Sequence, residues 1–303
     1  MRAYRYLHLD VFTGTPLEGN QLAVFPEPAG LSTEDMRAIT REMNFSECTF
    51  IFPPETPGTD VRMRIFTPGE ELPMAGHPTI GSTFALAKEG VIATGRDAFV
   101  FGLGVGPTPV SLDWKAGTLD FVWMTQKNPV FGGTIGDRAA LAAAIGVGTT
   151  DLADAPPQVV SCGVPFLFAA LRTRRAVDAV TLELKQYTEV CRAAAIDALP
   201  IFVFTTERAS TTGDEAVYSR MLAPGFGISE DPATGGASGP LACYIHAYQV
   251  LDRGRLSHIV SLQGAKMLRP SRVHMSLDTA QDTITRVRVG GRSVLVGEGT
   301  LSF

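Results

Sequence analysis

The feature that most constrains the fold is a turn rich in small residues that leads into an apolar segment and occurs twice. The first copy, Ala75-Gly76-His77-Pro78-Thr79, leads into residues 84–87. The second, Thr234-Gly235-Gly236-Ala237-Ser238, leads into residues 241–245, at an offset of 234 − 75 = 159. This offset is close to half of the 303-residue chain. The repeat therefore predicts a duplicated protein with two lobes.

Strand patterns outnumber helix patterns in both halves of the chain. Helices are expected at 33–43, where Ser32 or Thr33 can act as the N-cap, and at 79–89, 137–145, 184–195 and 240–251. Strands are expected at 4–12, 21–25, 48–52, 61–66, 91–101, 109–113, 118–124, 158–162, 166–171, 201–205, 216–221, 259–263, 272–277, 284–289 and 293–297. This order favours an α+β fold over a doubly wound parallel sheet. Polar residues 126–133 are the expected linker, and 225–239 the expected glycine-rich loop.

Composition excludes several classes of protein. Hydrophobic residues make up 45% and charged residues 19%, which is typical of a globular chain with a large core. The net charge of −5 and the lack of an extended basic cluster argue against nucleic-acid binding. No apolar run reaches the roughly 20 residues that a membrane helix needs. The N-terminus also lacks the apolar core of a signal peptide, so we expect a cytoplasmic enzyme without a membrane partner.

Glycine-rich turns at helix starts can bind anions. Such a turn leaves backbone N–H groups unpaired, and the helix dipole adds positive potential. Two such turns could hold a carboxylate or an enolate-like intermediate, although glycines can also simply permit tight turns. Neither turn matches a nucleotide-binding fingerprint, and residues 102–106 lack the helix that such a site requires. Zinc-ligand spacing and a nucleophile elbow are also absent.

Three polar residues are candidates for acid/base chemistry. Glu47 is flanked by Phe45 and the apolar residues 50–52, so partial burial should raise its pKa towards neutrality. His77 lies in the first turn, and Asp231 opens the second. Each of the three residues also has a structural reading, as a cap, a surface group or a turn residue.

Several segments together resemble the phenazine-biosynthesis PhzF-like family, which has the diaminopimelate-epimerase-like fold. The segments that carry the resemblance are 10–13, 16–24, 44–50, 64–81, 230–235, 263–264 and 269–271. The resemblance implies two similar lobes, each a β-sheet or barrel around a central helix. It assigns residues 1–126 plus about 285–303 to the first lobe and residues 127–284 to the second, with the active site in the cleft between them.

The resemblance also implies a function. Family members isomerise trans-2,3-dihydro-3-hydroxyanthranilate, and a glutamate at the position of Glu47 shuttles the proton. His77 and Asp231 match two further polar site positions. Positions that contact the substrate match Ser46, Gly76 and Gly235. A small anionic metabolite, a homodimer and no metal or organic cofactor are implied as well.

Two positions depart from the family pattern. Gly236 replaces a serine that contacts the substrate, so Gly236 lines the expected site without a hydroxyl, and Ser238 is a candidate to compensate. Leu268 stands where a glycine usually precedes Arg-Pro-Ser. Ala75 and Thr234 occupy the places of the two cysteines found in related racemases, which argues against a two-thiol racemase.

The prediction is therefore a cofactor-independent isomerase that moves a proton on a small carboxylate-bearing metabolite. An epimerase, racemase or dehydratase of the same fold is one alternative. A non-catalytic protein that binds a small metabolite is the other.

Overall fold

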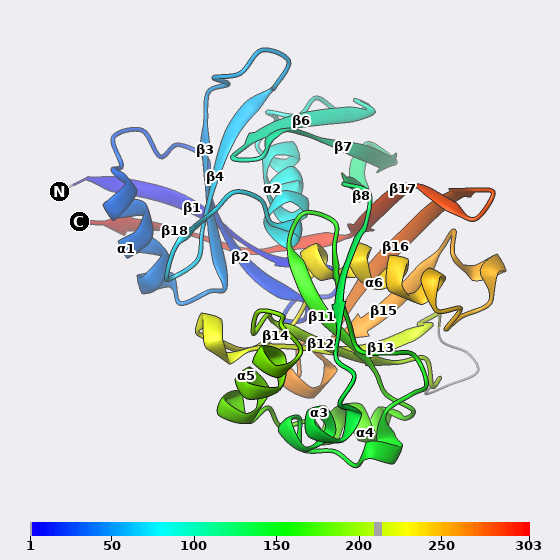
Figure 1. The fold of residues 1–303 in the computed structure, drawn as a ribbon. Coiled ribbons are helices and arrows are strands. Elements are labelled where there is room, and N and C mark those ends of the chain that lie inside the picture. Colours follow the sequence, from blue (N-terminus) through cyan, green and yellow to red (C-terminus); the bar gives the residue numbers. More distant parts are fainter. Residues whose placement is uncertain (1, 209–213) are drawn as a thin grey trace. The chain divides into compact units, whose positions relative to one another are not determined.

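The computed structural model describes residues 2–208 and 214–303, which divide into two units (Figure 1). Unit 1 comprises Met1–Thr125 and Gly290–Phe303, and unit 2 comprises Gln126–Val289. The first strand, β1 (Ala3–Val11), pairs antiparallel with the last, β18 (Ser293–Ser302). Both ends of the chain therefore belong to unit 1.

Unit 1 consists of strands that surround one helix. After β1 its elements are β2 (Asn20–Phe25), α1 (Thr33–Met43), β3 (Glu47–Phe52), β4 (Val61–Phe66), β5 (Glu71–Leu72), α2 (Gly76–Lys88), β6 (Ala98–Leu103), β7 (Gly106–Lys115) and β8 (Thr118–Gln126). Strands β1 and β2 are antiparallel, β2 and β3 are parallel, and β3 and β4 are antiparallel. Strand β4 pairs antiparallel with β5 and parallel with β6, which pairs antiparallel with β7.

Unit 2 repeats this topology. Its elements are β9 (Val130–Thr134), α3 (Arg138–Ala144), β10 (Gln158–Ser161), β11 (Pro165–Ala170), α4 (Arg174–Ala179), α5 (Leu184–Ala193), β12 (Ile201–Thr205), β13 (Val217–Ala223), β14 (Ile228–Asp231), α6 (Gly235–Ala247), β15 (Ile259–Gln263), β16 (Ser271–Ala280) and β17 (Thr283–Gly291). The pairs β10–β11, β12–β13, β13–β14 and β15–β16 are antiparallel, whereas β11–β12 and β13–β15 are parallel. Strands β1 to β7 of unit 1 follow the same pattern.

The central helix of each unit is enclosed by strands (Figure 1). Helices α2 and α6 each have 13 residues, and their starts differ by 235 − 76 = 159 positions. Helix α2 contacts β1, β2, β3 and β18, and α6 contacts β10, β11 and β16. Most residues of both helices are buried, as expected for helices that lack a polar face. The α+β class and the arrangement of each lobe around a central helix are confirmed.

Several predicted boundaries are wrong. Helices α2 and α6 begin at Gly76 and Gly235, so most of the predicted turn residues are already helical. Pro78 is harmless in the first turn, because N–H groups there have no acceptor within the helix. Pro240 lies inside α6, where the packing of the surrounding strands outweighs the lost hydrogen bond.

Three other predictions made from local sequence patterns differ from the structure. The strand predicted at 91–101 begins only at Ala98. Residues 130–134 form β9, which pairs with β10, rather than a linker. Glu47 is the first residue of β3 instead of part of the preceding connection. Within the described part of the chain, every helix is too short or too polar to cross a membrane.

Candidate active site

The first candidate cluster lies in unit 1, where β2, β3 and α2 bring Asn20, Glu47 and His77 together. Helix α1 ends at Met43, and the left-handed backbone of its C-cap residue Asn44 (φ 53°) turns the chain into β3. The parallel pairing of Leu22 with Glu47 places the starts of β2 and β3 side by side. Oε2 of Glu47 lies 3.5 Å from Nε2 of His77, and these side chains are only 13% and 4% exposed.

A chain of side-chain contacts fixes the orientation of His77. The Ser46 hydroxyl donates to Oδ1 of Asn20 at 3.1 Å, so the Asn20 amide nitrogen faces the other way. That nitrogen lies 3.4 Å from Nδ1 of His77, to which it can donate. Nε2 of the neutral imidazole then carries the proton and faces Glu47. The cluster is therefore built to place an N–H group beside the carboxyl of Glu47.

The carboxyl of Glu47 is poised for proton transfer. Burial raises its pKa from 4.5 to about 7, and the neighbouring Ser46 hydroxyl offsets only part of this rise. In the described structure, Oε2 of Glu47 is buried and makes no hydrogen bond, which leaves it able to accept a proton from a ligand.

The second candidate cluster lies in unit 2, around Asp231 at the end of β14. Oδ2 of Asp231 accepts a hydrogen bond from the Thr234 hydroxyl at 2.5 Å. The Gln263 side chain, at the end of β15, donates to the Asp231 carbonyl at 2.8 Å and to Thr234 Oγ1 at 3.0 Å. It also accepts from the Thr234 N–H at 3.1 Å. Gln263 thus holds the turn between β14 and α6 in one conformation.

The start of α6 carries Gly235 and Gly236. Gln126 donates to the Gly235 carbonyl at 2.9 Å, which anchors the first turn of the helix. The Ser238 hydroxyl donates back to the Thr234 carbonyl at 2.9 Å, and the Ser238 side chain is fully buried. The Ser238 hydroxyl is therefore engaged within its own helix.

The sequence candidates separate into these two clusters. Unit 1 brings together Ser46, Glu47 and His77, with Gly76 as the first residue of α2, and unit 2 brings together Asp231, Gly235 and Gly236. Three site residues were not identified from the sequence by role, namely Asn20, Thr234 and Gln263. Their signal is a polar side chain at the edge of an apolar strand or helix, a pattern common at ordinary turns.

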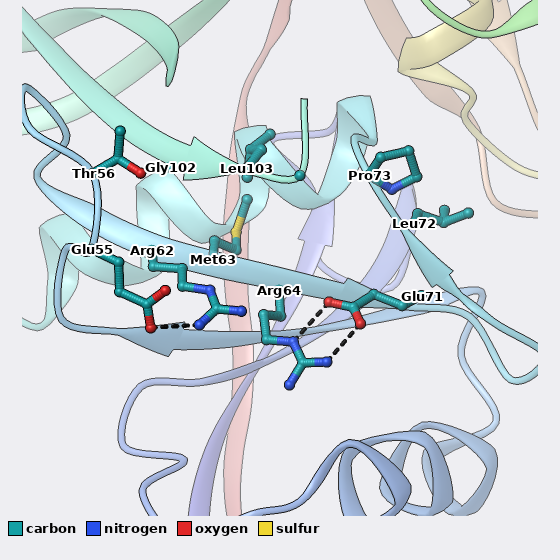
Figure 2. Close-up of a pocket in the computed structure, with 11 residues that line it drawn as sticks. Glu55, Thr56, Arg62, Met63, Arg64, Glu71, Leu72, Pro73, Gly102 and Leu103 are labelled. Atoms are coloured by element: carbon teal, nitrogen blue, oxygen red, sulfur yellow. Dashed lines mark hydrogen bonds and ion pairs between the residues drawn. The ribbon is translucent and has the colours of Figure 1, made fainter. Parts of the chain in front are cut away.

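A separate hollow of about 460 Å³ in unit 1 does not include Glu47 or His77 in its lining (Figure 2). Two arginines line it, and each already has a carboxylate partner. Arg62 pairs with Glu55, and Arg64 forms two hydrogen bonds with Glu71, which lowers the pKa of Glu71. Since both cations are neutralised, this hollow is a poor match for an anionic ligand. The buried polar clusters are the better candidate site.

Across residues 2–208 and 214–303, the structure contains no group of three or more His, Cys, Asp or Glu side chains that could hold a metal ion.

Comparison with known proteins gives the family. The family model described as phenazine biosynthesis-like protein (PhzC-PhzF) matches residues 9–299. An uncharacterised isomerase from Mesorhizobium japonicum is 34% identical over 304 residues, covering 99% of each chain. A trans-2,3-dihydro-3-hydroxyanthranilate isomerase from Pseudomonas aeruginosa is 33% identical over 296 residues, covering 98% of each chain. The crystal structure of a PhzF-family protein from Bacillus anthracis has the same fold, with a TM-score of 0.85, 24% identity and full coverage of both chains. The chain therefore belongs to the phenazine biosynthesis-like protein family and is an isomerase.

Proposed function

We propose that Glu47 is the acid/base group of this isomerase and moves a proton on a small carboxylate-bearing metabolite without a cofactor. The observation that carries the proposal is the buried Glu47 carboxyl, whose pKa is raised to about 7 and whose Oε2 lies 3.5 Å from Nε2 of His77. A group with a pKa near neutrality can both remove and return a proton.

The reaction balances without a co-reactant. Ionised Glu47 removes a proton from a carbon next to a double bond, and the C–H electron pair moves into the unsaturated system. Protonated Glu47 then delivers the proton to a more distant carbon of the same molecule, so that the atoms of substrate and product are identical. Nε2 of His77 lies 3.5 Å from Oε2 of Glu47 and faces the carboxyl that exchanges the proton.

The helix starts are suited to the charge of the substrate. The N-cap residues Ala75 and Thr234 make no side-chain cap to α2 and α6. The first N–H groups of a helix have no partner within it and carry positive potential. We assign Gly76, Gly235 and Gly236 to binding the carboxylate and the enolate-like charge that develops. Asp231 supports this role by holding Thr234.

The resemblance to the family also suggests the assembly. We include in the proposal that the protein is a homodimer. The substrate class is the one named for the Pseudomonas aeruginosa relative, trans-2,3-dihydro-3-hydroxyanthranilate or a close analogue. A Cβ atom at Gly236 would meet nothing closer than the Phe166 ring at 3.9 Å, so the site has room for ligand atoms there.

The substitution Glu47→Gln tests the proposal, because glutamine keeps the size of the side chain but cannot take up the proton. We expect turnover of trans-2,3-dihydro-3-hydroxyanthranilate to fall by roughly 10²- to 10⁴-fold, with an unchanged circular dichroism spectrum. Glu42→Gln, on the exposed surface of α1, is the matched control and should keep full activity. Full activity of the folded Glu47→Gln protein would refute the proposal.

The same assay separates the alternatives. Deuterium uptake from heavy water without net isomerisation would indicate an epimerase or racemase, and loss of water would indicate a dehydratase. Thermal stabilisation by anionic metabolites that are never converted would indicate a binding protein.

A further inference from the structure

The first turn of α6 is intrinsically weak. Gly235, Gly236 and Gly239 lie within its first five residues, and glycine is unfavourable in a helix. The N-cap residue Thr234 makes no side-chain hydrogen bond to the helix. Pro240 has no N–H group, so the Gly236 carbonyl lacks its usual donor four residues later. The conformation of this turn therefore depends on contacts from outside the helix.

Gln126, the last residue of β8, makes such a contact within unit 2. Its side-chain amide donates to the Gly235 carbonyl at 2.9 Å, and the residue is only 8% exposed. Gly239 leaves the space that this side chain occupies, since a Cβ there would collide with Oε1 of Gln126. Gly235 and Gly239 are four residues apart and share one face of the helix. Gln126 therefore lies along the first turn of α6.

This contact has a cost to stability. Oε1 of Gln126 is buried against Gly239 and, in the described structure, makes no hydrogen bond. A buried acceptor without a donor costs free energy that an apolar side chain of similar size would avoid. Rotating the amide gives no relief, because it would place Oε1 against the Gly235 carbonyl oxygen. The tolerated cost is consistent with a role of Gln126 in the site.

The peptide bond between Gly235 and Gly236 links this contact to the ligand. A trans peptide is planar, so its N–H group points away from its carbonyl. A donor fixed on the Gly235 carbonyl therefore fixes the direction of the Gly236 N–H and also polarises it. That N–H precedes the bond from Ala237 to the Thr234 carbonyl. Building on the proposed function, in which Gly236 binds the substrate carboxylate, we propose that Gln126 is a positioning residue that aims the Gly236 N–H at this carboxylate.

Gln126→Met tests this proposal, because methionine keeps the length of the side chain but cannot donate. The probe is acetate, and the readout is the Gly236 amide resonance in protein labelled with ¹⁵N-glycine. Gly236→Ala identifies that resonance by removing it, and a Cβ there would meet nothing closer than the Phe166 ring at 3.9 Å. Acetate should shift the native resonance until the site is saturated. In Gln126→Met the acetate affinity should fall roughly tenfold, equivalent to about 1.4 kcal/mol.

Stability separates positioning from a purely structural role. Methionine removes the hydrogen bond to the Gly235 carbonyl together with the unpaired Oε1, so the urea midpoint of unfolding should stay close to the native value. The acetate affinity is measured without urea, where the variant is folded. A residue that served only the fold would lower the midpoint and leave the acetate affinity unchanged.

Gln158→Met is the matched control. The Gln158 side chain also donates to a glycine carbonyl, that of Gly132 at 3.0 Å, and it accepts from the hydroxyl of Tyr248 at the other end of α6. This variant should bind acetate like the native protein. Native acetate affinity in Gln126→Met would overturn the inference and leave the assignment of Gly236 in place. A native Gly236 resonance that does not respond to acetate would overturn both, while the Glu47→Gln assay would still decide the acid/base role.

Discussion

At the scale of single residues, the Glu47 carboxyl is held in a state that folding disfavours. Burial raises its pKa from 4.5 to about 7, so the folded protein holds a proton that the unfolded chain has already lost. If this position served only the stability of the fold, an amide side chain or an acid with a cationic partner would be favoured there. The tolerated cost at Glu47 is therefore consistent with a functional role.

This cost predicts how stability depends on pH. Between pH 4.5 and 7 the folded state binds more protons than the unfolded state, so the free energy of unfolding falls as pH rises and then levels off. The shift at Glu47 corresponds to a loss of roughly 3 kcal/mol at most. Glu47→Gln removes this term, so urea unfolding at pH 4 and pH 8 should show the variant gaining stability over the native protein as pH rises.

The exposed change Glu42→Gln provides the baseline for that comparison. A Glu47→Gln protein whose stability, relative to the native protein, is the same at pH 4 and pH 8 would show that Glu47 has an ordinary environment.

At the scale of elements, the sequence predicts types better than boundaries. The pattern at 33–43 gives α1 with its Ser32 cap, because capping chemistry is local. Local sequence patterns do not predict the starts of α2 and α6, because glycine and proline normally signal turns. Only the enclosing strands make these segments helical. The candidate site is also only partly predictable. Sequence motifs identify Glu47 and Asp231, but the contacts of Gln263 depend on strand pairing and are not visible in the sequence.

Close packing around α2 gives a prediction at this scale. A Cβ at Gly81 would lie 2.6 Å from Leu22 Cδ2 and 2.7 Å from Val11 Cγ2, and both residues are fully buried. Gly81→Ala should therefore destabilise the protein by roughly 1–3 kcal/mol, despite the better helix propensity of alanine. Urea unfolding measures the change.

Gly136→Ala is the matched control for this change, because a Cβ at exposed Gly136 would meet nothing within 4 Å. Its stability should stay within about 0.5 kcal/mol of the native value. A Gly81→Ala protein as stable as this control would show that α2 has more space than the described packing allows.

At the scale of the whole molecule, the two units share a topology but have different chemistry. At the offset of 159, His77 is equivalent in the repeat to Gly236, and Asp231 is equivalent to Leu72. Strand β3 begins with Glu47, whereas the equivalent strand β12 begins with Ile201. The described buried pair of Glu47 and His77 therefore belongs to unit 1. Unit 2 has the start of α6 and the Asp231 cluster. The repeat was visible in the sequence, but this division of roles required the side-chain contacts.

The central claim, that Glu47 is poised to exchange a proton, is tested most directly by titrating the side-chain carboxyl carbons of ¹³C-labelled glutamate by NMR. The native protein should show a carboxyl with a pKa near 7 whose resonance disappears in the Glu47→Gln variant. A native spectrum in which no glutamate carboxyl has a pKa near 7, or one in which a resonance with a pKa near 7 survives the substitution, would contradict the claim.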